Sequence, residues 1–195
     1  MKTITKTFEL FTLSELSAKA QQEAFDNWLS TFEYGWNEEN RETLNVFCSL
    51  FDVVCSHWQY DACTYHFNCS TNHSQIIEEL KGQRLATYIN NHYWHELFPA
   101  KLYWKHRKSR KSRIIKDTSC SLTGYFMDDC ILQPMYDFLR QPDENINFIN
   151  LMNQCLEGFF SACRDDVSDR ESEDNFKSES EINEWEYLAD GKIFN

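Results

Sequence analysis

One short segment of this chain is strongly basic, and the rest of the sequence is strongly acidic. Eight of its nineteen Lys and Arg residues lie between Lys101 and Lys116, and no Asp or Glu interrupts them. The other 179 residues carry thirty-one acids against eleven bases, a net charge of −20. Charge of this size opposes a compact state by self-repulsion and favours association with basic partners. The charge therefore indicates a basic partner and does not identify a fold.

Length and composition predict a folded, soluble protein. A chain of 195 residues, 42% of them apolar, buries about two thirds of its unfolded surface in one domain. We predict a single domain over residues 1–195, with a basic hairpin or loop insertion over 101–116 and an acidic helical extension over 164–183. The first five residues lack the apolar run of a signal peptide, and no apolar run approaches 18 residues, so we expect a cytoplasmic protein.

Hydrophobic periodicity predicts both strands and helices. Alternation with period two predicts strands over residues 3–10 and 61–69. Spacing of three and four predicts a helix capped by Ser17 and another over residues 37–53. Start and stop signals predict three more helices: one from Ser74 that ends before Pro99, a short one capped by Asp128 or Asp129 that reaches Leu139, and a long one from about Asn147.

These elements predict an α+β fold. The pair Asp190-Gly191 lies between apolar runs, which is typical of a β-hairpin. Strands and helices are interspersed, and the chain has only five glycines. We therefore predict an antiparallel sheet with helices packed mainly on one face, a long acidic C-terminal helix and a terminal hairpin.

The acidic tract of residues 165–190 is the first candidate binding site. It has eleven acids and two bases, and Asp165, Asp169 and Glu173 would form an i, i+4 ladder on one helix. Such a stripe approaches the phosphate spacing of a nucleic acid strand. The alternative is a solvated helix or tail. We define the acid set as the predicted contact residues: Asp165, Asp166, Asp169, Glu171, Glu173, Asp174, Glu179 and Glu181.

The basic run is a secondary candidate patch. Beside Tyr103 and Trp104 it contains six central bases: Lys105, Arg107, Lys108, Arg110, Lys111 and Arg113. Aromatic and cationic residues together bind single-stranded nucleic acid, but the surrounding negative charge repels phosphates. We therefore favour a partner role toward the acidic tract, within the chain or between subunits, and expect no direct nucleic acid binding.

Metal and catalytic sites are weaker hypotheses. Zinc ligands could come from Cys63, His66, Cys69 and His73, but alternation puts Cys63 and Cys69 on the strand face opposite His66. A metal-dependent hydrolase would use His57, Asp61, His66 and Asp128. The chain has no phosphate-binding Gly-x4-Gly-Lys loop, no dinucleotide fingerprint and no Gly-x-Ser-x-Gly elbow. We expect no cofactor, no metal and no catalytic residues, and hence a protein that is not an enzyme.

Three stretches resemble a group of small acidic phage and prophage proteins, some labelled antirestriction or antitoxin-like. They are Leu13-Ser14-Glu15-Leu16-Ser17 with Ala20, Ala24 and Trp28; Leu122-Thr123-Gly124-Tyr125 with Asp128-Asp129; and Tyr136-Asp137-Phe138-Leu139 with Pro142-Asp143-Glu144-Asn145. In that group a glycine-containing run is expected near position 60, where this chain has Trp58-Gln59-Tyr60-Asp61-Ala62-Cys63.

The resemblance implies a phage or mobile-element protein in a bacterial host cell. Together with the charge it suggests an inhibitor of a host defence complex, of anti-CRISPR or antirestriction type, that presents acids to a nucleic-acid-binding groove. Alternatives are an antitoxin-like or other protein-binding module and a metal-dependent hydrolase. The sequence leaves the oligomeric state and the target open.

Overall fold

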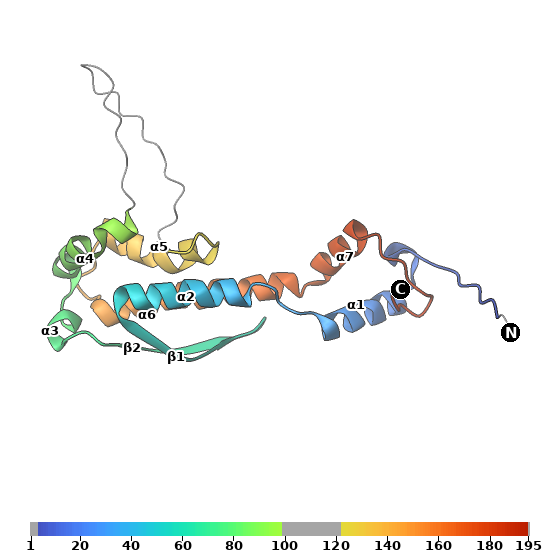
Figure 1. The fold of residues 1–195 in the computed structure, drawn as a ribbon, viewed down its shortest axis with the longest axis horizontal. Coiled ribbons are helices and arrows are strands. Elements are labelled where there is room, and N and C mark those ends of the chain that lie inside the picture. The colour runs from blue at the N-terminus through green and yellow to red at the C-terminus, as the bar shows by residue number, and fades with distance from the viewer. Residues whose placement is uncertain (1–3, 99–121, 195) are drawn as a thin grey trace, which may run out of the picture. The chain divides into compact units, whose positions relative to one another are not determined.

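The computed structural model describes residues 4–98 and 122–194, and these form two compact units (Figure 1). The terminal unit comprises residues 1–35 and 165–195, and the sheet unit comprises residues 36–164. Each unit contains its own cluster of buried hydrophobic side chains. Helices and an antiparallel sheet occur together, which confirms the predicted α+β class.

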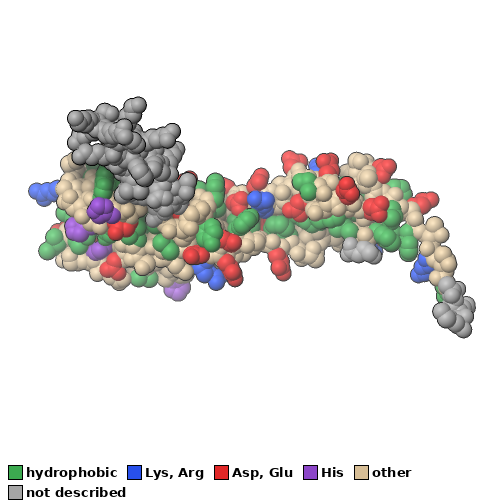
Figure 2. Space-filling model, turned by 45° about the horizontal axis from the view of Figure 1, so that its top comes forward, with side chains coloured by type: hydrophobic (Ala, Val, Ile, Leu, Met, Phe, Trp, Pro, Cys, Tyr) green, Lys and Arg blue, Asp and Glu red, His purple; other side chains and the backbone are tan. Residues whose placement is uncertain are grey.

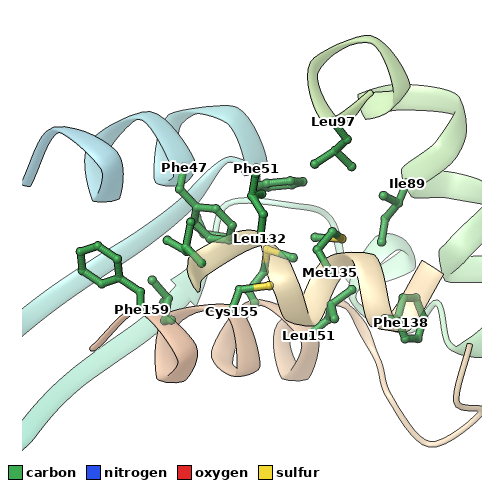
Figure 3. Close-up of a cluster of buried hydrophobic side chains, with 14 of the residues drawn as sticks. Phe47, Phe51, Ile89, Leu97, Leu132, Met135, Phe138, Leu151, Cys155 and Phe159 are labelled. Carbon is green, nitrogen blue, oxygen red and sulfur yellow. The ribbon is translucent and has the colours of Figure 1, made fainter. Parts of the chain in front are cut away.

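The sheet unit is built from two strands and several helices. In chain order they are α2 (Asn37–Phe51), β1 (Val53–Tyr60), β2 (Tyr65–Thr71), α3 (Gln75–Glu78), α4 (Gly82–Leu97), α5 (Met127–Arg140) and the first part of α6 (Phe148–Arg170). Figure 3 shows how α2, α4, α5 and α6 surround the core, with Phe51, Leu97, Met135 and Cys155 converging from the four helices.

One face of the sheet packs on α6. Strands β1 and β2 are antiparallel, and their aromatic side chains contact Phe160 of α6, with ring centroids 6.0 Å away for Trp58 and 5.0 Å away for Phe67. The register is irregular between Ser56 and Gln59, and His57 has a left-handed φ of 51°. This bulge shifts the inward side chains from odd to even positions, so β1 has no continuous alternation in the sequence. Because its alternation is interrupted, β1 was not predicted from the sequence.

Three predicted elements of the described chain differ from the structure. Residues 4–10 form no strand, since only Phe11 pairs, through a single bridge to Tyr187. The helix predicted from Ser74 is two helices, α3 and α4, because Lys81 between them leaves the helix to bridge Asn147. The strand predicted over 61–69 begins only at β2, because Asp61 accepts hydrogen bonds from the next turn.

Asp128 organises the start of α5 from inside the helix and is not its cap. The side chain is fully buried in the first turn. It accepts hydrogen bonds from the backbone N–H groups of Thr123 and Gly124, both 2.8 Å away, and from the hydroxyls of Thr123 at 2.7 Å and Thr43 of α2 at 3.1 Å. The carboxylate thus links the loop before α5 to α2.

The terminal unit has a small aromatic core. Its elements are the short 3-10 helix η1 (Leu13–Glu15), α1 (Ala18–Thr31), residues 165–170 of α6, and α7 (Glu173–Ile182). The Ser17 hydroxyl caps α1 as predicted, accepting from the Ala20 N–H at 3.3 Å. Trp28, Phe176 and Tyr187 are buried together, and the Tyr187 hydroxyl lies 2.8 Å from the buried Ser180 hydroxyl.

The sequence predicts a β-hairpin at Asp190-Gly191, and the chain does reverse there, but its two arms pair only through an isolated bridge between Tyr187 and Ile193 and form no strands. The Gly191 N–H donates to the Leu188 carbonyl at 2.9 Å, and the Leu188 N–H donates to the Lys192 carbonyl at 2.8 Å. Gly191 has a φ of 88° and lies against the backbone of α1, where a Cβ would collide with the Ala20 carbonyl oxygen. Both the turn and the close approach require glycine.

Replacement of Asp128 should destabilise the sheet unit. Asp128→Ala leaves the partly buried donors of the loop and the buried Thr43 hydroxyl without their shared acceptor, so the free energy of unfolding of α5 should fall by about 2 to 3 kcal/mol. Native-state hydrogen exchange measures this for α5 directly. The matched control is Asp129→Ala, an exposed neighbour, which should change it by less than about 1 kcal/mol. Equal effects of the two changes would contradict the assigned role of Asp128.

Gly191→Ala should destabilise the terminal unit by about 2 to 4 kcal/mol, because the new Cβ is strained at this φ and forces the turn away from α1. Gly35→Ala in the same unit is the control, since a Cβ there meets nothing within 4 Å. Hydrogen exchange of the α1 amides reports both variants. Unchanged exchange in Gly191→Ala would show that the turn does not pack on α1.

Candidate acidic interface

The acid set lies on two helices and not on one continuous stripe. Asp165, Asp166 and Asp169 belong to the end of α6, and Glu171 lies in the turn that follows. A new helix begins after Ser172, whose hydroxyl accepts from the Asn175 N–H at 3.1 Å. The other four members follow in α7: Glu173, Asp174, Glu179 and Glu181.

The predicted ladder of Asp165, Asp169 and Glu173 is therefore wrong in its second step. Asn175 reinforces the break, because its side-chain amide donates to the Arg170 carbonyl at 2.8 Å and so satisfies the end of α6. A helix break at 171–172 removes the i, i+4 relation between Asp169 and Glu173. The regular spacing that suggested a copy of a phosphate backbone is lost.

Several members of the acid set have side-chain contacts within the terminal unit, and two of them are also partly buried. Asp166 accepts a short hydrogen bond from the Tyr34 hydroxyl and lies 3.8 Å from the Arg170 guanidinium. Glu179 is half-buried and accepts from the Asn175 side chain at 3.2 Å. Their carboxylates are consequently less available to a partner than the exposed ones of Asp169 and Glu181.

Almost all of the chain's net charge belongs to the terminal unit. Residues 1–35 and 165–195 contain sixteen acids and six bases, a net charge of −10 out of the −12 of the whole chain. The sheet unit, with fifteen acids and thirteen bases, is close to neutral because eight of those bases belong to residues 101–116, which lie outside the described residues. Figure 2 shows acidic side chains spread over the part of the molecule that contains α7. A basic partner would be attracted to this unit in particular.

A groove of about 950 Å³ lies within the terminal unit, between η1 with α1 on one side and α7 with residues 184–186 on the other. Its apolar lining includes Phe25 of α1, Phe176 of α7 and Trp185. The rings of Phe25 and Phe176 are 5.6 Å apart, and those of Phe176 and Trp185 are 6.4 Å apart. We call these three rings the groove floor.

The groove rim is acidic. It carries Glu173, Glu181, Glu184 and Glu186, and among the described residues Lys177 is its single base. Lys177 is itself paired with Glu173 at 3.4 Å. Glu181, Glu184 and Glu186 form no ion pair with any residue that the structure describes. The rim thus presents uncompensated negative charge next to aromatic surface.

Sequence reasoning identified only part of this groove. Glu173 and Glu181 belong to the acid set, but Glu184, Glu186 and the whole floor were not predicted as site residues. A signal was present in Trp185, which stands between two glutamates at the end of the acidic tract. The contribution of Phe25 had no such signal, because Phe25 lies about 150 residues before Phe176 in the sequence.

The secondary basic patch lies outside the described residues. All six of its members belong to residues 99–121: Lys105, Arg107, Lys108, Arg110, Lys111 and Arg113. Its partner role toward the acidic tract remains a prediction.

The Cys and His candidates for zinc are not brought together. Cys63 is exposed in the turn between the strands, His66 lies on the exposed sheet face, and His73 contacts the Phe51 carbonyl at 3.0 Å. Within residues 4–98 and 122–194 no group of three or more ligating side chains has a geometry that could hold a metal ion. Burial raises the pKa of Cys69 to about 11, so loss of its proton to form a zinc-binding thiolate costs more than for an exposed thiol.

The residues of the hydrolase hypothesis are likewise separated by their environments. His57, Asp61 and His66 are exposed on the hairpin of β1 and β2, whereas Asp128 is fully buried among its hydrogen-bond donors.

In the described part of the chain none of the helices is both long and apolar enough to cross a bilayer.

Salt should stabilise the terminal unit more than the sheet unit. Raising NaCl from about 0.1 M to about 1 M shortens the Debye length from about 10 Å to about 3 Å and so weakens the repulsion among the sixteen acids. Hydrogen exchange of α1 and α7 should slow, and exchange of α2 and α5 should change less. An equal response of the two units would show that self-repulsion is not concentrated in the terminal unit.

Comparisons with protein-family models, with curated proteins and with solved structures find no match to this chain.

Proposed function

We propose that this chain is a binding protein whose terminal unit engages a basic surface of its partner. The observation that carries the proposal is the concentration of net charge, −10 out of −12, in one small unit with a groove whose rim is acidic. Local stability does not explain this concentration, because like charges within one unit repel one another. A function in recognition accounts for it.

The hypothesised target is a host defence complex with a basic nucleic-acid-binding groove. In this hypothesis the chain is an anti-defence protein of a phage or mobile element, of anti-CRISPR or antirestriction type, as the resemblance of its sequence suggests. Long-range attraction between the terminal unit and a basic groove would speed association and would compete with DNA or RNA for the same surface. The proposal rests on charge density and no longer on a phosphate-like spacing, because the acidic ladder is broken at residues 171–172.

Charge reversal tests this proposal. In the test variant, four exposed acids of the terminal unit are replaced: Asp165→Lys, Asp169→Lys, Asp174→Lys and Glu181→Lys. In the control variant, four exposed acids of the sheet unit are replaced: Glu79→Lys, Glu96→Lys, Asp137→Lys and Glu157→Lys. Both variants change the net charge by the same amount, so a difference between them reports the location of the acids.

The tagged full chain is used to capture partners from nuclease-treated bacterial lysate, with elution in a salt gradient. We expect the same partner with the native chain and the control variant, released at moderate salt and displaced by added DNA, and no partner with the test variant. Circular dichroism of both variants serves as the control that they are folded. If the test variant still captures the partner, and the partner elutes at the same salt concentration as from the native chain, the terminal unit is not the binding surface.

A further inference from the structure

We infer that the groove of the terminal unit binds a Lys- and Arg-rich peptide segment that carries an aromatic or large aliphatic anchor residue. The inference rests on the proposed function, because it names how the terminal unit recognises a basic partner. It goes further in assigning recognition to one groove, in place of the acidic surface as a whole.

The groove floor provides the site for the anchor. Phe176 is buried and forms the base of the cluster, while Phe25 and Trp185 are half-buried and keep part of their rings accessible. The volume of about 950 Å³ is larger than any single side chain and is at the upper end of ordinary ligand pockets. An apolar side chain placed there leaves water and contacts the accessible parts of these rings, which is how anchor residues stabilise interfaces.

The groove rim decides the charge of the occupant. Three of its glutamates, Glu181, Glu184 and Glu186, have no cationic partner among the described residues, and the single rim base is already paired with Glu173. Cationic side chains would satisfy these carboxylates with charge-assisted hydrogen bonds. A nucleic acid or an acidic peptide would be repelled by the same rim.

A peptide segment fits the two parts of the site better than a smaller ligand does. A small cation would use the rim and leave the rings bare, and a neutral apolar molecule would use the rings and leave the rim charges unpaired. An amphipathic segment uses both at once, as in other peptide-binding grooves. An Arg of such a segment could also stack on Trp185, since guanidinium groups are attracted to the face of an indole ring.

Two labelled peptides of equal charge test the role of the floor. One is a Lys and Arg peptide that carries Leu and Trp, and its twin has Ser at the apolar positions. Fluorescence anisotropy with the full chain should show binding of the apolar peptide at least about tenfold tighter than binding of the twin. Equal affinities would overturn the groove as an anchor site.

Two double variants of equal charge test the role of the rim. Glu181→Lys with Glu184→Lys changes the rim, and Asp165→Lys with Asp169→Lys changes exposed acids of the same unit that do not line the groove. We expect the rim variant to lose about tenfold more affinity for the apolar peptide than the control does. Equal losses would overturn the groove but leave the proposed function intact. No loss in either variant would overturn both.

Two other occupants of the groove, a second copy of this chain and a nucleic acid, are tested by two further measurements on the same variants. If sedimentation shows that the native chain self-associates and the rim variant does not, the groove is filled by a second copy, which overturns the assignment to a foreign segment. If labelled single-stranded DNA binds the native chain as well as the apolar peptide does, the rim does not select cations and the inference fails.

Discussion

The stability of the terminal unit and the shape of its groove both depend on the packing of aromatic side chains. Trp28 of α1, Phe176 of α7 and Tyr187 of the C-terminal segment are buried together, and they join stretches from both ends of the sequence. This small core has to offset the self-repulsion that follows from a net charge of −10. Because the core is aromatic and partly open, its edge also forms the floor of the groove. Stability and recognition in this unit thus draw on the same rings.

The two units differ in charge, and we expect them to differ in their ability to attract a basic partner. The sheet unit is nearly neutral and holds the larger core, in which Asp128 is satisfied by the loop before α5 and by α2. The terminal unit carries most of the net charge and the groove. Long-range attraction would bring a basic partner to the terminal unit, and short-range contact with Trp185 and its neighbours would select among such partners. Charge alone does not distinguish one basic protein from another, whereas an anchor site does.

Hydrophobic spacing was sufficient to predict the helices that bury one continuous stripe. Helices α1, α2 and α6 follow their predicted positions because their apolar residues recur every three or four positions. Strand β1 was missed because the bulge at His57 interrupts its alternation, and residues 4–10 were predicted wrongly because alternation does not supply a partner strand. The acids of the candidate site are visible in the composition. The groove is not, because it depends on the tertiary pairing of Phe25 with Phe176.

Binding of a basic partner in the groove between α1 and α7 can be tested by hydrogen exchange of the full chain, measured with and without a saturating Lys and Arg peptide that carries Leu and Trp. We expect slower exchange in η1, α1, α7 and residues 184–187, and unchanged exchange in α2, α4 and α5. Protection in the sheet unit, or protection at the end of α6 without any in α1, would contradict it.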